Sequence, residues 1–128
     1  PADGGSNFIV LRYADVLLML AEIEAQLGST SRALDYLNPV RERAGLGVVT
    51  DNNKEVVLEK IALERRLELV NEGHRWFDLI RYGTAVEVMN QWFATHNMNI
   101  VISQNHLLQP IPQNQIDTDP AMVQNPGY

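Results

Sequence analysis

Three glutamates recur at every fourth position in the middle of the chain, at Glu64, Glu68 and Glu72. Side chains four residues apart share one face of a helix, so this spacing predicts an acidic stripe. A glycosidase places two such carboxylates on either side of a sugar bond, with the pKa of one of them raised in a cleft. Arginines close in sequence favour a different interpretation, in which the carboxylates form stabilising charge pairs. We therefore predict a structural ion-pair network and no enzyme activity.

The predicted network continues past the acidic stripe. Arg75 and Asp78 lie three residues apart, a spacing that fits an ion pair on one helix face, and we expect both to be partly buried. The network members are Glu64, Arg65, Glu68, Glu72, Arg75 and Asp78. A glycoside hydrolase stays open as an alternative, and it requires Glu64 or Glu68 in an open cleft with a raised pKa.

The histidines and cysteines give no sign of a metal or nucleophile site. His74 and Asp78 lie four residues apart, but a metal needs three or four convergent ligands, and His96 and His106 have no partner at metal spacing. The chain has no cysteine, which excludes disulfides and thiolate ligands. It also lacks the G-x-S-x-G turn that presents a hydrolase serine. We expect no metal, no cofactor and no catalytic triad.

Five aromatic residues cluster within residues 76–93. Sugars present apolar C–H faces that can stack on aromatic rings, and the Asn- and Gln-rich residues that follow can pair with sugar hydroxyls. Aromatic side chains at helical spacing are more often core residues. The candidate glycan contacts are Trp92, Trp76 and Tyr82. Trp92 is expected to be the best exposed of the three, because it follows two polar residues.

A helical hairpin is predicted over residues 11–46. Apolar residues occupy nearly the whole circumference of a first helix over residues 12–27, and Gly28 is a natural stop. The apolar face of the second helix comprises Ala33, Leu34, Leu37 and Val40. Pro39 predicts a kink in that second helix. The hairpin has the size and layout of one tetratricopeptide unit.

Further helices are predicted over residues 52–95. Asn52 with Glu55 has nearly the pattern of a capping box, in which a cap side chain and an acidic residue three positions later bind the first helical turn. Thr84 with Glu87 is a second such box. No alternation of strands and helices is present. The fold class is therefore mainly α.

Residues 96–128 are predicted to form a long, ordered, irregular tail. Prolines and an Asn-Pro-Gly triplet interrupt any helical period, yet the segment has too many apolar residues for a free linker. With 128 residues, the chain has room for one domain, so we expect a single domain over residues 1–128.

The charge balance excludes one class of partner. The chain carries 10 Lys and Arg against 16 Asp and Glu, and this net charge of -6 argues against nucleic-acid binding. All the cations lie between Arg12 and Arg81. No apolar run is long enough for a membrane span, and no signal peptide is visible. Because the sequence starts at Pro1 without Met, we expect a mature segment or an excised fragment.

Six short motifs resemble, in their order along the chain, the C-terminal part of the SusD/RagB family. They are Arg12-Tyr13-Ala14-Asp15, Leu37-Asn38-x-Val40-Arg41-x-Arg43-Ala44-Gly45-Leu46, Glu64-Arg65-Arg66-x-Glu68-Leu69, Glu72-Gly73-His74-Arg75-Trp76-Phe77-Asp78-Leu79, Pro110-Ile111-Pro112 and Gln124-Asn125-Pro126-Gly127-Tyr128. The fourth and sixth motifs are the most specific. The resemblance covers nearly the entire chain.

This resemblance implies a location and a function. SusD/RagB proteins are outer-membrane lipoproteins that capture glycans at the cell surface and pass them to a SusC-like TonB-dependent transporter. The resemblance thus implies a non-catalytic glycan-binding component, lipid-anchored in the complete protein, with a glycan and a transporter as its partners. In the family, most glycan contacts come from regions before this one, so no binding residue is transferred to this chain.

The resemblance also implies that the chain is the C-terminal fragment of a longer protein. A fragment cut from a larger fold should expose apolar surface where other helices packed, so we expect self-association through the first two helices. The alternative function is a tetratricopeptide-like scaffold that docks a helix or an extended peptide and has no glycan site in this fragment.

Overall fold

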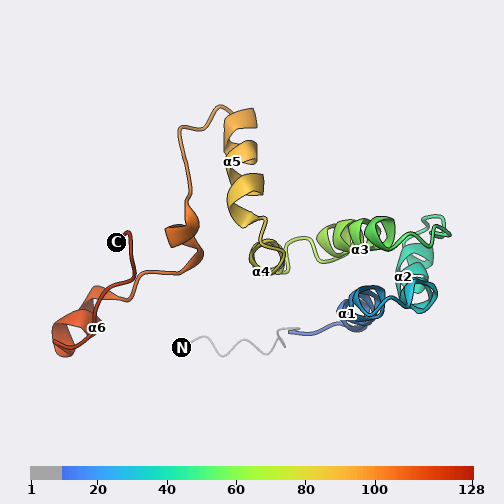
Figure 1. Cartoon of the computed structure of the whole chain (residues 1–128), viewed down its shortest axis with the longest axis horizontal. Coiled ribbons are helices and arrows are strands. Elements are labelled where there is room, and N and C mark those ends of the chain that lie inside the picture. Colours follow the sequence, from blue (N-terminus) through green and yellow to red (C-terminus); the bar gives the residue numbers. More distant parts are fainter. Residues whose placement is uncertain (1–9) are drawn as a thin grey trace, which may run out of the picture. The chain divides into compact units, whose positions relative to one another are not determined.

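The computed structural model describes residues 10–128, and the regular elements in that range are all helices (Figure 1). They are α1 (Tyr13–Gln26), α2 (Thr30–Arg43), α3 (Lys54–Glu68), α4 (Arg75–Arg81), α5 (Ala85–Thr95), the 3-10 helix η1 (Gln104–Leu107) and α6 (Gln113–Thr118). The predicted mainly α-helical fold is confirmed, with no strand in the described part of the chain.

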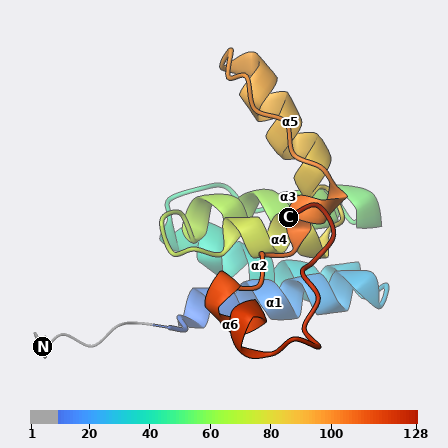
Figure 2. The same cartoon turned by 90° about the vertical axis from the view of Figure 1, so that its left-hand side faces the viewer.

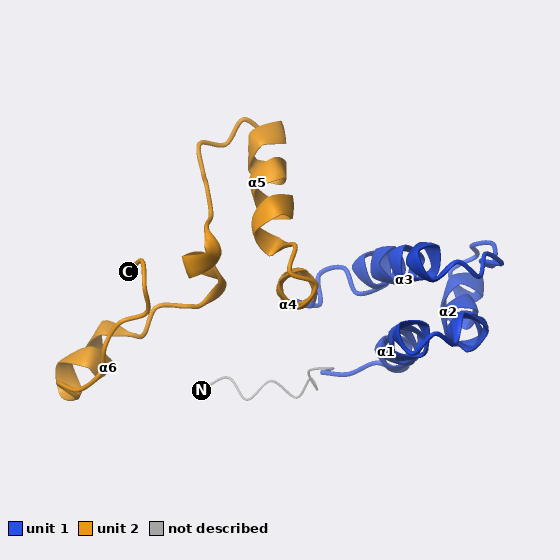
Figure 3. Ribbon diagram, viewed as in Figure 1, with its two compact units in different colours: residues 1–74 blue, residues 75–128 orange. Residues whose placement is uncertain are grey.

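The chain divides into two compact units, residues 1–74 and residues 75–128 (Figure 3). Helices α1, α2 and α3 contact one another in the first unit, and α4 contacts α5 in the second (Figure 2). The single-domain expectation and the tetratricopeptide-like layout both stay predictions.

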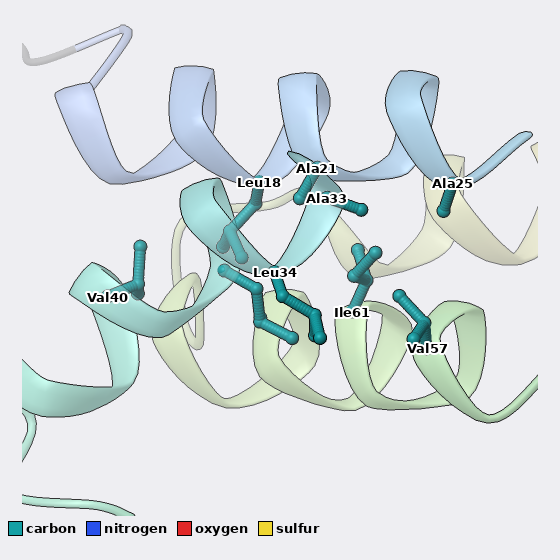
Figure 4. Close-up of a cluster of buried hydrophobic side chains, with 9 residues drawn as sticks. Leu18, Ala21, Ala25, Ala33, Leu34, Val40, Val57 and Ile61 are labelled. Atoms are coloured by element: carbon teal, nitrogen blue, oxygen red, sulfur yellow. The ribbon is translucent and has the colours of Figure 1, made fainter. Parts of the chain in front are cut away.

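The core of the first unit lies among its three helices (Figure 4). Its buried members are Leu18, Ala21, Ala25, Ala33, Leu34, Leu37, Val40, Val57 and Ile61. The four residues predicted for the inner face of the second helix are all in this cluster. Alanines on both α1 and α2 allow the two helix backbones to approach closely, and the larger side chains of α2 and α3 fill the remaining space.

The turn from α1 to α2 depends on Gly28, as the sequence predicted. Gly28 has a φ of 90°, which favours glycine, and its N–H donates to the Ala25 carbonyl at 3.1 Å. The Ser29 N–H donates to the Glu24 carbonyl at 2.8 Å, which completes the hydrogen bonds of a glycine-terminated helix. Helix α2 continues past Pro39 to Arg43, and the kink expected there stays a prediction.

Both predicted capping boxes were wrong in detail. The N-cap of α3 is Asn53, whose side-chain oxygen accepts from the Val56 N–H at 3.1 Å. Asp51 accepts a hydrogen bond from the Asn53 N–H at 2.8 Å and so fixes the turn one residue later than predicted. Thr84 is the N-cap of α5, but its φ of -108° and ψ of 2° lie outside the extended region, and its side chain makes no capping bond.

The second unit is held by side-chain amides as well as by its small core. Leu79 and Ala85 are buried where α4 meets α5. Asn90 on α5 donates to the Ile102 carbonyl at 2.9 Å and accepts from the Ile102 N–H at 2.8 Å. Gln124 makes the same two-way contact with Ile111, at 2.9 and 2.8 Å. These amide pairs order a segment that has few backbone hydrogen bonds.

The tail is less irregular than predicted, because it contains η1 and α6. Both helices are short and flanked by Ser103 or Pro112, so no helical period is visible in the sequence. The chain end is tied back by Tyr128, whose hydroxyl donates to the Leu108 carbonyl at 2.9 Å. Gly127 lies against Asn105, where a Cβ would come within 2.6 Å of the amide nitrogen, so this contact requires glycine.

Candidate functional site

Arg12, immediately before α1, joins two members of the acidic stripe. Its Nε donates to both carboxylate oxygens of Glu72, at 3.0 and 2.9 Å, and its Nη1 donates to Oε1 of Glu68 at 2.8 Å. Its Nη2 donates to the main-chain oxygen of Glu68 at 2.9 Å. Arg43, the last residue of α2, also pairs with Glu68. The Glu68 carboxylate therefore links all three helices of the first unit.

Two further ion pairs hold α3 against its neighbours. Arg41 donates from Nη1 to Oε2 of Glu64 at 2.7 Å and from Nε to the Gly47 carbonyl at 2.9 Å. Arg65 donates from Nη1 to Oδ1 of Asp15 at 2.7 Å, with only 5% and 4% of the two side chains exposed. The buried Asp15, Glu64 and Arg65 each have an opposite charge within hydrogen-bond distance, as burial of a charge requires.

Glu72 has the electrostatics of a structural ion pair. The hydrogen bond from Arg12 lowers the pKa of Glu72, and the same contact raises the pKa of Arg12. A glycosidase acid needs the opposite shift, a raised carboxyl pKa. The stripe side chains are engaged by arginines that lie 23 to 60 residues away in sequence. This geometry favours the ion-pair interpretation of the stripe.

In the second unit, Asp78 is buried and accepts a hydrogen bond from Nη2 of Arg81 at 3.0 Å. The same Arg81 lies over the ring of Tyr82, with its guanidinium carbon 4.4 Å from the ring centre. One face of Tyr82 is thus covered by a cation. The ion pair predicted between Arg75 and Asp78 stays a prediction.

The three aromatic candidates differ in exposure. Trp92 on α5 is 46% exposed, whereas Trp76 on α4 and Tyr82 after it are half-buried. This agrees with the expectation that Trp92 is the best exposed. The Trp92 indole stacks on the imidazole of His96, with ring centres 4.2 Å apart and planes 27° apart. Phe93 meets the indole edge-on, with ring centres 5.5 Å apart.

His96 is the residue that the sequence reasoning missed at this site. The sequence suggests only a metal-ligand role for it, and within residues 10–128 no group of three His, Asp or Glu side chains could hold a metal. The available signal was its spacing of four residues from Trp92, which places two rings on one helix face.

Among the described helices, none has the length and apolarity that crossing a membrane requires.

The comparisons with known proteins extend over nearly the whole chain. The family model described as "SusD family" matches residues 2–128. A SusD-like protein, P38 of Formosa agariphila, is 35% identical over all of this chain and 26% of its own length. A second SusD-like protein of that organism, P25, is 38% identical over 95% of this chain and 25% of its own length. The chain thus spans about a quarter of these curated relatives.

Solved structures give the same correspondence. The surface glycan-binding protein A of Bacteroides thetaiotaomicron has a TM-score of 0.76 and 37% identity, covering 93% of this chain and 24% of that protein. The protein of the same name from Bacteroides uniformis has a TM-score of 0.79 and 35% identity, covering 91% and 27%. The fold of this chain is therefore similar to one part of larger glycan-binding proteins.

Proposed function

Because the chain belongs to the SusD family, we propose that it is the C-terminal part of a non-catalytic protein that binds oligosaccharide or polysaccharide at the cell surface. The observation that carries the proposal is its similarity to two surface glycan-binding proteins, at 37% and 35% identity over more than nine-tenths of the chain. The complete protein is anchored at the outer membrane by a lipid and passes its glycan to a SusC-like TonB-dependent transporter.

The mechanism is reversible binding without covalent chemistry. Aromatic faces stack on sugar rings, and amide and hydroxyl groups pair with sugar hydroxyls. Trp92 is the most exposed of the three candidate contacts, whereas Trp76 and Tyr82 are half-buried. The carboxylates of Glu64 and Glu68 on α3, and of Glu72 beyond its end, support the absence of catalysis, since each of them is engaged by an arginine.

The test uses the complete protein that contains this chain. It is run through native gels that hold soluble polysaccharides, among them amylopectin, hydroxyethyl cellulose, xyloglucan and galactomannan. The proposal predicts retardation by at least one glycan, without any release of reducing sugar. A protein that migrates unchanged in every gel, or that cleaves the retarding glycan, would contradict the proposal.

A second candidate function is a docking scaffold, and one observation favours it. The outer side of α1 carries exposed apolar side chains at helical spacing, which are Val16, Met19, Leu20, Ile23 and Leu27. An amphipathic helix of a partner can cover such a row. Retention of a synthetic amphipathic helix by the wild-type chain, with loss on Ile23→Glu, would favour this function, and no retention would remove it.

A further inference from the structure

The C-terminal end of α5 is built by an asparagine in a left-handed conformation. Asn97 has a φ of 54°, and its N–H donates to the Ala94 carbonyl at 3.2 Å. The Met98 N–H donates to the Phe93 carbonyl at 2.9 Å. These two bonds are those of the motif that commonly ends helices at glycine. They fix the backbone of the turn that carries His96.

The imidazole of His96 is itself held in place. Its Nδ1 lies 2.8 Å from the main-chain oxygen of Trp92. A carbonyl oxygen can only accept, so Nδ1 carries the proton and donates it to this bond. The ring therefore has one hydrogen bond and one stacking contact, both with the same tryptophan.

This double contact covers one face of the Trp92 indole. We call the indole held in this way the platform. The imidazole covers one face of the indole, and Phe93 meets the indole edge-on. With the imidazole stacked on the indole, 46% of Trp92 stays exposed. A free surface tryptophan loses rotamer freedom when a ligand stacks on it, and a tryptophan held in advance avoids most of that loss.

The charge around the platform points to the chemistry of the ligand. Residues 82–128 contain no Lys or Arg, and their acidic residues are Glu87, Asp117 and Asp119. Binding of a sulfated or uronic acid glycan normally uses cations to pair with its anionic groups. The platform has no such cation from its own helix or from the tail that follows. The neighbouring α4 carries Arg75 and Arg81, and Arg81 is engaged by Asp78 and by the ring of Tyr82. The segment that carries the platform therefore suits an uncharged sugar.

We propose that the free face of Trp92 binds a pyranose unit of a neutral glycan and that His96 is a positioning residue, which holds the indole for stacking. This inference rests on the proposed glycan-binding function and deepens it. His96 acts through its ring. Phenylalanine at position 96 should replace the stacking contact, whereas alanine should not.

The test compares four variants of this chain in native gels that contain the neutral polysaccharides named above. We expect Trp92→Ala to abolish retardation and His96→Ala to weaken binding about two- to tenfold, the factor of one immobilised side chain. His96→Phe should restore binding to within about twofold of the wild type. Phe77→Ala removes another exposed ring, on α4, and should bind like the wild type. Circular dichroism checks that each variant is folded.

The ligand class is tested with two polymers that share one backbone, hydroxyethyl cellulose and carboxymethyl cellulose. Alginate and heparin are added to the neutral polysaccharides named above as further anionic glycans. The uncharged cellulose derivative should retard the chain at least as strongly as the charged one, and no anionic glycan should retard it more strongly than every neutral one. A preference for anionic glycans would overturn the neutral ligand class.

The outcomes separate this inference from the function on which it rests. If the chain is retarded and Trp92→Ala or His96→Ala is retarded equally, the platform is wrong and the proposed function stands. If His96→Phe is as weak as His96→Ala, the positioning role of the ring is wrong. If only the complete protein is retarded, and its Trp92→Ala variant is retarded equally, the platform is wrong and the proposed function stands. If neither is retarded by any glycan, the proposed function fails and the platform fails with it.

Discussion

The buried pair of Arg65 and Asp15 is the most consequential single contact in the first unit. Both side chains are almost fully buried and lie 2.7 Å apart. Removing one partner leaves an uncompensated buried charge, which typically costs about 3–5 kcal/mol. We expect Arg65→Ala to lower the free energy of unfolding by about that amount, as measured by urea denaturation.

An exposed ion pair provides the matched control. Arg32 pairs with Glu24 at 3.0 Å, but 65% of the arginine side chain is exposed. Exposed pairs contribute about 0–1 kcal/mol, so Arg32→Ala should change the free energy of unfolding very little. Equal losses from the two substitutions would show that burial does not determine the strength of these pairs.

The contact between Arg12 and Glu72 should make stability depend on pH. The pKa of Glu72 is lowered in the folded state from an ordinary value of 4.5. A carboxyl with a lowered folded pKa contributes stability above its unfolded pKa and loses it as the pH falls through the folded pKa. We expect Glu72→Gln to have a lower Tm than the wild type at about pH 7 and the same Tm at about pH 2.

The Tm of the wild type and of Glu72→Gln is measured across this pH range by thermal unfolding followed with circular dichroism. A difference in Tm that stays constant from neutral to acid pH would contradict the role of the Glu72 charge. Arg12→Lys serves as a control, because lysine keeps the charge but loses the planar guanidinium that reaches both glutamates.

At the scale of elements, side-chain amides connect segments that the helices alone would leave loose. Asn38 on α2 holds Val49, donating to its carbonyl at 3.1 Å and accepting from its N–H at 2.8 Å. Asn90 holds Ile102 in the same way. Each amide replaces the two hydrogen bonds that a neighbouring strand would supply.

Substitution of Asn90 tests this contact. Asn90→Ala removes both bonds and leaves the Ile102 N–H and carbonyl without this partner, which should cost about 1–3 kcal/mol. Asn90→Asp keeps the acceptor for the Ile102 N–H but places a carboxylate oxygen against the Ile102 carbonyl, so it should not restore wild-type stability. Hydrogen exchange of the Ile102 amide is the direct measurement. If the Ile102 amide is as protected in Asn90→Ala as in the wild type, the contact between Asn90 and Ile102 does not order the chain around Ile102.

The core of the first unit could be predicted from local patterns, and the contacts that tie it together could not. Ala33, Leu34, Leu37 and Val40 recur with a helical period, and Gly28 marks the helix end, so the sequence identifies the hairpin and its inner face. The partners of the acidic stripe lie on other helices, as Arg12 does, and no local spacing reveals them.

The difference between local patterns and specific contacts also explains why the sequence misplaces the cap of α3 by one residue and misses His96. The N-cap of α3 is Asn53, whose N–H donates to Asp51, and not the neighbouring Asn52. Two adjacent asparagines are equally good caps by residue type, so the sequence does not reveal which of them makes the capping bond. The stack of His96 on Trp92 has a local signal, the spacing of four residues, but that spacing equally fits two unrelated surface residues.

At the scale of the whole molecule, the exposed apolar row on α1 predicts self-association of the isolated chain. Leu27 is 77% exposed, and the row runs along the outer side of the helix with Ile23 between its ends. We expect sedimentation velocity to show an increase in mass with concentration, and Ile23→Glu to reduce it. Val101→Glu, at an exposed apolar position of the other unit, is the control. A monomer at every concentration would contradict this expectation.

The family membership and the site together support one account, in which this chain contributes a glycan contact to a larger surface protein. The measurement that tests it most directly is a parallel native gel of the isolated chain, the complete protein and the Trp92→Ala variant of each, on one retarding polysaccharide. The account predicts that both wild-type proteins are retarded and that the substitution weakens both. Retardation of the complete protein alone, unchanged by Trp92→Ala, would contradict it and would assign these 128 residues to the scaffold.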